Sequence, residues 1–179
     1  MRALLVSFAL LASTAVVHAQ DAANTLVMQL KDGEVRIDLN TEGAPKHAER
    51  LKTLANDGFY DGLKFHRVIP GFMAQTGDPQ GTGMGGSDLP DLEAEFTDAP
   101  FERGTVGMAR SADPNSANSQ FFIMFDAAPH LNGAYTVIGN VTSGMEAVDA
   151  VKKGAVSANG AVDDPDTIVK MRTADKIDS

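Results

Sequence analysis

The first third of the chain alternates apolar and polar residues in the way that a β-hairpin and an amphipathic helix do. Residues 25–30 and 34–39 are β-prone runs separated by a Lys-Asp-Gly turn sequence, and in the second run every other residue is apolar. In residues 44–55 the apolar residues recur at helical spacing, and an Asn-Asp-Gly stop follows. The pattern predicts a hairpin with one buried face, followed by a helix of about three turns.

The centre of the chain has a different texture, which predicts antiparallel strands joined by loops. Short apolar runs are cut by glycine, proline, asparagine and aspartate, a pattern that suits a barrel or a sandwich better than βαβ units. The predicted strands are residues 63–68, 73–76, 92–96, 105–109, 120–125 and 135–141. Helical spacing returns at residues 145–153, residues 155–166 resemble a surface loop, and residues 167–171 can form a last strand. The expected fold is mainly β, with two helices on a closed antiparallel sheet.

Composition limits the size and the chemistry of this fold. A chain of 179 residues with 43% hydrophobic residues can bury one core without metal or disulfide staples, so one domain is expected. The chain contains no cysteine, which excludes disulfides, thiolate catalysis and cysteine-based zinc sites.

The N-terminus has the three parts of a secretory signal peptide. Arg2 supplies a positive n-region, residues 3–17 are almost wholly apolar, and Val17 and Ala19 are the small residues of a cleavage site. The apolar stretch is shorter than the roughly 20 residues that span a bilayer. We therefore expect residues 1–19 to be a signal peptide and residues 20–179 to be the mature domain. The protein is then expected in the periplasm, or outside the cell as a secreted protein.

Charge narrows the range of partners. Loss of Arg2 with the signal peptide leaves 14 of the 15 basic residues against 24 acidic ones, a net charge near −10. Such a chain repels nucleic acid and anionic lipid, so neither is an expected partner. No stretch after the signal approaches the length that spans a membrane. A soluble monomer is expected.

One glycine-rich segment resembles a nucleotide-binding loop but lacks its setting. Residues 81–86 satisfy G-x-G-x-x-G, which cradles a phosphate only between a strand and the start of a helix. Pro90 blocks a helix soon after the segment, so no helix N-terminus is available. We expect a flexible glycine loop at the rim of a site and no bound nucleotide.

Metal and hydrolytic chemistry also lack their motifs. The four histidines are His18, His47, His66 and His130, and no pair of them has metal-ligand spacing. A hydrolase built on Ser111 or Ser119, with one of the last two histidines as its base, lacks a G-x-S-x-G elbow. His66 can equally be a packed strand histidine, and Glu93 and Glu95 alternate along a predicted strand as on a solvated face. No metal and no cofactor is expected.

The segment from Phe65 to Gln75 carries the most informative group of residues. Arg67 lies a short turn away from Phe72 and Met73, and the Pro-Gly pair between them forces that turn. A guanidinium beside an apolar hollow is a polar group aimed at a ligand, as in a typical binding pocket.

Ordered blocks make the sequence resemble the cyclophilin family over roughly residues 25–171. Two of its most diagnostic blocks are FHRVIPGFMAQ at 65–75 and SQFFI at 119–123, and further matches in order and spacing are GTG at 81–83, GTVGMA at 104–109 and VIG at 137–139. The resemblance implies an eight-stranded antiparallel β-barrel closed by two helices and a substrate groove on its outer face. It also implies peptidyl-prolyl cis-trans isomerase activity without a cofactor.

The resemblance further implies which residues form the groove. The catalytic residues are then Arg67, Phe72 and Gln75. The substrate-binding residues are Met73, Gly83, Ala109, Arg110, Ser111, Gln120, Phe122, His130, Leu131 and Tyr135. Three of these depart from many relatives: His130 replaces a tryptophan that favours cyclosporin binding, Tyr135 replaces a histidine, and Arg110 replaces an asparagine. The pattern resembles bacterial members, and strong cyclosporin binding does not follow from it.

The reaction that the resemblance implies suggests a division of labour. Rotation about an X-Pro bond breaks no bond and needs no nucleophile, but its barrier is about 18–20 kcal/mol. The proline ring would be held by an apolar set, Phe72, Met73, Phe122 and Leu131. Arg67 would donate a hydrogen bond to the imide nitrogen as it loses conjugation, while Gln75 and backbone groups around Arg110 hold the preceding carbonyl. The expected partners are proline-containing polypeptides, and the alternative is a chaperone that binds proline segments without turnover.

Overall fold

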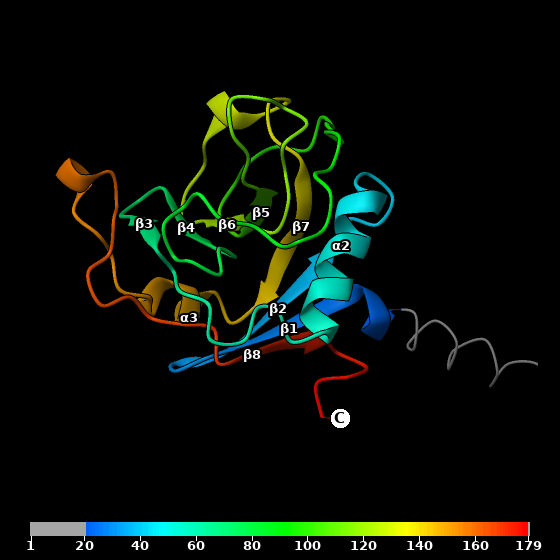
Figure 1. The fold of residues 1–179 in the computed structure, drawn as a ribbon, viewed down its shortest axis with the longest axis horizontal. Coiled ribbons are helices and arrows are strands. Elements are labelled where there is room, and N and C mark those ends of the chain that lie inside the picture. The colour runs from blue at the N-terminus through cyan, green and yellow to red at the C-terminus, as the bar shows by residue number, and fades with distance from the viewer. Residues whose placement is uncertain (1–20, 179) are drawn as a thin grey trace, which may run out of the picture.

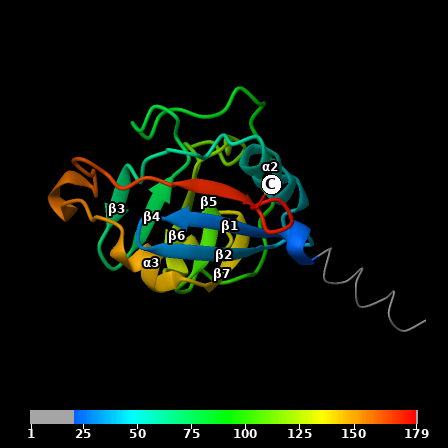
Figure 2. The same ribbon diagram turned by 90° about the horizontal axis from the view of Figure 1, so that it is seen from below.

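The structure is a computed structural model that describes residues 21–178, so the predicted signal peptide lies outside the described residues. Within them, eight strands form one antiparallel sheet in the order β3-β4-β6-β5-β7-β2-β1-β8 (Figure 1). In Figure 2, β8, β1 and β2 lie in front of β4, β6 and β5, so the sheet curls around its own interior. The strands are β1 Thr25–Leu30, β2 Gly33–Leu39, β3 Arg67–Ile69, β4 Met73–Thr76, β5 Thr105–Met108, β6 Phe121–Met124, β7 Val137–Ser143 and β8 Lys170–Thr173. The mainly β fold class is confirmed.

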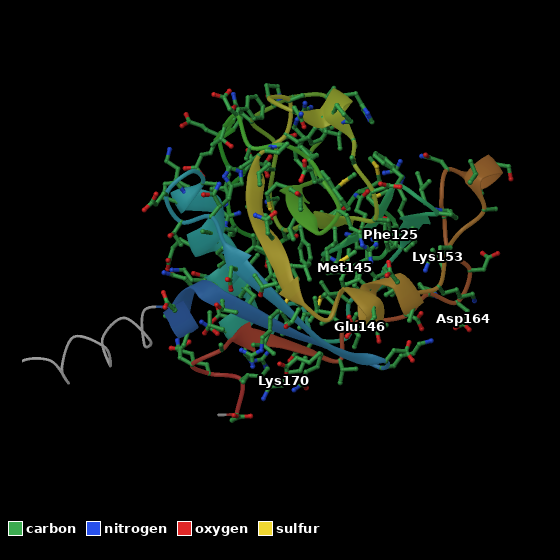
Figure 3. The ribbon with its side chains drawn as sticks, turned by 180° about the vertical axis from the view of Figure 1, so that it is seen from behind. Phe125, Met145, Glu146, Lys153, Asp164 and Lys170 are labelled. Carbon is green, nitrogen blue, oxygen red and sulfur yellow. The ribbon has the colours of Figure 1, made fainter. Side chains whose placement is uncertain are left out.

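The hairpin and both predicted helices are present. β1 pairs with β2, and the apolar residues of β2 are buried as the alternation predicted. Helix α2, Pro45–Asn56, begins with proline in its first turn and buries the apolar face that the helical spacing predicted. Helix α3, Met145–Ala150, is three residues shorter than predicted, because Val151 turns to extended backbone and the N–H of Gly154 bonds to the carbonyl of Val68 in β3. Figure 3 labels Met145, the first residue of α3, and Lys153, which follows the helix. No helix among residues 21–178 has both the length and the apolar character to cross a membrane.

One predicted strand is absent from the described residues, and several others have shifted ends. Residues 92–96 form only a single bridge, at Leu92, because the following N–H groups donate to side-chain oxygens of Asn115 and Thr136 and leave no ladder to form. The run predicted at 63–68 contributes only its end to β3, and β7 starts and ends two residues later than predicted. β5 and β6 match the prediction to within one residue at each end.

The edge strands β3 and β8 do not form a ladder, so the prediction of a closed barrel is too strong. Residues 154–168, the closing segment, seal the gap. Two isolated β-bridges join this segment to β3 and the residues just before it: Lys64 pairs with Thr167, and Arg67 pairs with Ala161. Pro165 has no N–H to donate and Asp164 has a left-handed backbone (φ +51°), so this stretch cannot continue as a strand. The strand predicted at 167–171 therefore begins only at Lys170.

Strands β4 and β6 carry apolar residues on both faces, and this places the site. Successive side chains of a strand point to opposite sides of the sheet. The inward residues are Ala74, Phe121 and Ile123, which join the main core. The outward residues are Met73, Phe122 and Met124, which form a second apolar cluster with Phe101, Leu131 and Val137. This outer cluster is the floor on which the site is built.

Glu95 caps helix α2 and is not part of a solvated face. Its carboxylate accepts hydrogen bonds from the backbone N–H groups of Lys46 and His47 at 3.2 and 3.1 Å and lies 2.7 Å from Nδ1 of His47. An acceptor at a helix N-terminus satisfies unpaired N–H groups and suits the helix dipole. Burial lowers the pKa of His47. The expectation of a solvated side chain holds only for Glu93, whose side chain is 79% exposed.

The closing segment can be tested at two neighbouring residues. Ile168 is fully buried in the main core, whereas Val169 is 58% exposed. We expect Ile168→Ala to lower the free energy of unfolding by about 2–5 kcal/mol, because it leaves a cavity where the segment seals the core. Val169→Ala is the control and should change it by less than about 0.5 kcal/mol. Urea unfolding followed by circular dichroism measures both; equal effects would contradict a sealing role.

Candidate functional site

Two adjacent hollows lie on the outer face of the sheet and share Gln75, Ala109 and Arg110. The arginine hollow, of about 330 Å³, is lined in addition by Arg67, Phe72, Met73, Phe122, His130, Leu131 and Tyr135. The glycine-loop hollow, of about 530 Å³, includes Gly83, Ser111 and Gln120. Every residue that the sequence assigned to a site therefore lines one of the two hollows, although the role of each residue stays a prediction.

The floor of the arginine hollow is apolar and closely packed. Met73, Phe122 and Leu131 are 2%, 6% and 8% exposed. The rings of Phe101 and Phe122 stack with their centroids 5.7 Å apart, beneath the backbone of β5. Gly107 makes room for them, because a Cβ at this position would lie 2.6 Å from atoms of both rings. A glycine in the middle of a strand is thus required for the floor to exist.

The far wall of the arginine hollow consists of the three residues that depart from many relatives. His130, in the 3-10 turn η1 Pro129–Leu131, stacks on Phe72 with centroids 5.8 Å apart. The guanidinium of Arg110 lies 4.4 Å from the centre of the Tyr135 ring and donates to the carbonyl oxygens of Ser111 and Ala134 at 2.9 and 2.8 Å. Stacking and hydrogen bonds hold this wall in one arrangement.

A chain of side-chain hydrogen bonds forms the polar edge of the site. Nη1 of Arg67 donates to Oε1 of Gln75 at 3.1 Å, and Nε2 of Gln75 donates to Oε1 of Gln120 at 2.9 Å. Nε2 of Gln120 in turn donates to the carbonyl of Gly85 at 2.8 Å, which links both hollows. The ladder explains the contact, because Gln75 is opposite Arg67 on β3 and opposite Phe122 on β6. Burial lowers the pKa of Arg67, which nevertheless stays charged at neutral pH.

Asn159 is the second holder of Arg67, and the sequence did not identify it. Nε of Arg67 donates to the carbonyl of Asn159 at 3.1 Å, and Nη2 donates to its Oδ1 at 3.0 Å. The residue belongs to the stretch that was predicted to be a surface loop. Its Asn-Gly pair is a turn signal in the sequence, but only the folded chain places that turn beside β3.

Asp78, also missed, organises the glycine loop. Its buried carboxylate accepts hydrogen bonds from the backbone N–H groups of Gln80, Thr82 and Gly83 at 2.8, 2.8 and 2.6 Å. Burial alone would raise the pKa of Asp78, but these bonds and a further one from the N–H of Gly85 outweigh it and lower the pKa to about 2. The loop lies at the rim, as predicted, and a defined set of hydrogen bonds holds it.

Asn118 does the same for the loop that follows, and it too was missed. Its Oδ1 accepts from the N–H and the hydroxyl of Ser87 at 2.8 and 2.7 Å, and its Nδ2 donates to the carbonyl of Leu89 at 2.9 Å. A polar side chain that replaces a missing ladder cannot be recognised in the sequence without knowing which loop lies beside it.

The residues of the hydrolytic alternative do not come together. The hydroxyl of Ser119 is buried and donates to the carbonyl of Gly77 at 2.7 Å, and the hydroxyl of Ser111 lies 2.7 Å from that of Ser116. His66 is packed beneath Gly83 and is 9% exposed, as the packed-histidine interpretation predicts. Neither serine contacts a histidine, so no nucleophile and base pair is formed. No group of three or more potential metal ligands occurs within residues 21–178.

Comparison with known sequences gives a consistent result. Residues 25–173 match the model of a family described as cyclophilin type peptidyl-prolyl cis-trans isomerase/CLD. The chain is 57% identical over 163 residues to a probable peptidyl-prolyl cis-trans isomerase of Brucella suis, with 85% of this chain and 83% of that protein covered. It is 46% identical over 129 residues to peptidyl-prolyl cis-trans isomerase B of Bacillus subtilis, with 71% and 90% covered.

Solved structures with the same fold agree with the sequence matches. The cyclophilin AquaCyp293 from Hirschia baltica has a TM-score of 0.78 at 25% identity and covers 96% of this chain and 83% of its own. A cyclophilin type peptidyl-prolyl cis-trans isomerase of Cryptosporidium parvum, solved in the presence of the dipeptide Ala-Pro, has a TM-score of 0.75 at 27% identity. The match covers 83% of this chain and 98% of that one.

The role of Asp78 predicts a pH-dependent stability. A pKa of about 2 in the folded state, against an ordinary 3.8, contributes roughly 2 kcal/mol that is complete above pH 3.8 and is lost as the pH falls through about 2. Asp78→Asn should therefore lower the free energy of unfolding by about 2 kcal/mol at pH 7, since an amide N–H then faces the loop's own donors. Urea unfolding at several pH values should show that this difference shrinks toward pH 2. The control is the exposed Asp88→Asn; a gap that is the same at pH 7 and pH 2 would exclude this explanation.

Proposed function

The chain belongs to the cyclophilin-type peptidyl-prolyl cis-trans isomerases and is an enzyme of that type, and we propose that it acts on proline-containing segments of exported proteins as they fold. The observation that supports this is the arginine hollow, where a charged guanidinium stands at the edge of an apolar floor. Proline offers the same combination, an apolar ring whose nitrogen gains basicity when the imide twists. The Cryptosporidium parvum relative solved in the presence of Ala-Pro supports the choice of ligand.

The proposed mechanism stabilises the twisted imide and breaks no bond. The apolar floor holds the proline ring, and Arg67 donates a hydrogen bond to the imide nitrogen as it becomes pyramidal. In the planar ground state that lone pair is delocalised into the carbonyl and accepts poorly. The bond is therefore stronger in the transition state than in the bound substrate, which is the condition for acceleration. Each tenfold of rate requires about 1.4 kcal/mol of such differential binding.

The residue before the proline is held by backbone and amide groups. Among the described residues, the backbone N–H and carbonyl of Arg110 have no hydrogen-bond partner, and Arg110 lies between the two hollows. Gln75 uses its oxygen for Arg67 and one N–H for Gln120, which leaves one amide N–H for the substrate carbonyl. These groups bind the substrate backbone, so we propose broad tolerance for the side chain that precedes proline.

The competing function is a chaperone that holds proline segments without turnover. An apolar hollow alone would serve that function. A guanidinium held in a fixed direction by two other residues adds nothing to passive holding of a proline ring, but transition-state stabilisation requires it. The rate of isomerisation, measured beside the affinity for the same peptide, separates the two functions.

Export is part of the proposal and is supported by the sequence of residues 1–19. The positive, apolar and small-residue regions occur in the order that a signal peptidase substrate requires. We propose that the enzyme works in the periplasm or outside the cell, after cleavage behind Ala19. We propose that it acts there as a monomer.

The mechanism predicts a specific sensitivity at Arg67. We expect Arg67→Ala to lower kcat/KM for an X-Pro peptide on the order of 100-fold, and Arg67→Lys on the order of tenfold or more, because an ammonium lacks the planar fork of donors. A protease-coupled isomerase assay on residues 20–179 measures both. Arg36→Lys, at an exposed position of β2, is the control, because that arginine pairs with Glu34 away from the hollows. Wild-type rates in both Arg67 variants would refute the mechanism.

Export predicts the N-terminus of the mature protein. When the full chain is produced in a bacterium with an outer membrane, we expect the periplasmic fraction to contain protein that begins at Gln20. Mass spectrometry of the intact protein measures this. Replacing Leu10 and Leu11 with arginine interrupts the apolar region and should leave uncleaved protein in the cytoplasm. Uncleaved wild-type chain in the cytoplasm would contradict the proposed location.

A further inference from the structure

We propose that Asn159 is a positioning residue that fixes the direction of the Arg67 guanidinium while leaving its positive charge uncompensated. This rests on the role proposed above for Arg67. The backbone carbonyl of Asn159 accepts a hydrogen bond from Nε of Arg67, and its Oδ1 accepts one from Nη2, so Asn159 binds one edge of the guanidinium. With Gln75 on Nη1, three of the five N–H groups are engaged, and one N–H on each Nη is left for a substrate.

The backbone around Asn159 is built to present both oxygens in one direction. Asn159 follows the 3-10 turn η2, Val156–Ala158, and has a left-handed backbone (φ +53°), a conformation that asparagine tolerates better than most residues. Because of this turn, the main-chain and side-chain oxygens of one residue reach two N–H groups of one guanidinium. Two bonds to a single planar group define its orientation, which one bond cannot do.

The loop that carries Asn159 is attached to the strand that carries Arg67. The N–H of Val68 donates to the carbonyl of Gly160 at 2.8 Å, and the N–H of Gly154 donates to the carbonyl of Val68 at 2.9 Å. Gly160 also lies so close to β3 that a Cβ there would be 2.4 Å from Cγ1 of Ile69. Asn159 and Arg67 are therefore carried by two segments that are fixed to each other. The closing segment completes the site as well as the sheet.

The neutrality of Asn159 is the second half of the proposal. Among the other described arginines, Arg36, Arg103 and Arg172 each contact a carboxylate, whereas Arg50 and Arg110 donate to backbone carbonyls. Among the described residues, Arg67 is held only by amide and carbonyl oxygens, in a chain that carries an excess of acidic residues. A carboxylate would orient the guanidinium at least as firmly, but it would neutralise the charge that has to act on the imide nitrogen. Asparagine supplies direction without that loss.

Two substitutions separate direction from charge. Asn159→Asp keeps the shape and both acceptor oxygens but adds a negative charge. Asn159→Gly keeps the left-handed backbone and the carbonyl acceptor but removes Oδ1. We expect Asn159→Asp to lower kcat on the order of tenfold with little change in KM. We expect Asn159→Gly to lower kcat several-fold, since one of the two bonds from Arg67 to residue 159 is lost. Asn140→Asp, at an exposed position of β7, controls for the added charge.

The Arg67 Nε–H resonance in NMR spectra reports the orientation independently of activity. In Asn159→Asp this N–H should stay protected from exchange while kcat falls; in Asn159→Gly its protection should weaken. Melting temperatures measured for both variants show whether the loop is still folded.

If Arg67→Ala abolishes activity while both Asn159 variants keep wild-type kcat, the positioning role is wrong and the proposed function stands. If Asn159→Asp loses activity only through KM or through melting, the neutrality argument is wrong. If Arg67→Ala itself keeps full activity, the proposed function fails first.

Discussion

The pairing of β4 with β3 on one side and β6 on the other is the constraint from which the site follows. Gln75 is opposite Arg67 across one ladder and opposite Phe122 across the other. The polar and apolar halves of the arginine hollow are therefore neighbours because of strand register, and a slip of one residue would turn Gln75 and its partners to the other face. The same alternation gives β4 and β6 two apolar faces, one for the core and one for the floor of the hollow.

Loop segments provide the hydrogen bonds and the closure that the strand ladders leave missing. A curled sheet leaves an unpaired edge at β3 and another at β8, and residues 154–168 cover this gap with isolated bridges and loop hydrogen bonds. The same segment brings Asn159 to Arg67, so sealing the sheet and orienting the guanidinium are two results of one loop conformation. Around the glycine-loop hollow, Asp78 and Asn118 take the place of a ladder by binding loop N–H groups with side-chain oxygens.

The proposed chemistry depends on Arg67 keeping its positive charge free of a carboxylate partner. A protein with more acidic than basic residues keeps Arg67 away from carboxylates and surrounds it with neutral acceptors. The imide nitrogen gains basicity as the bond twists, so a donor that keeps its full positive charge stabilises the twisted state better than one paired with a carboxylate. The stacked pair of Arg110 and Tyr135, with His130 on Phe72, makes the opposite wall rigid without placing a carboxylate near the reacting bond.

The hairpin, the two helices, the mainly β class and the residues that line the hollows could all be predicted from the sequence. Each of these depends on local periodicity or on a compact ordered block. The sequence also identified Arg67 and Gln75, which lie on two successive strands joined by one short turn. The folded chain was needed to show that residues 92–96 are not a strand and that a loop closes the sheet. It was also needed to show that Glu95, Asp78 and Asn159 hold other segments in place. In each of those cases the partner is a backbone or side-chain group that the fold, and not the neighbouring sequence, brings within hydrogen-bond distance. A polar residue in a loop has the same appearance in a sequence whether it faces water or a guanidinium 92 positions away.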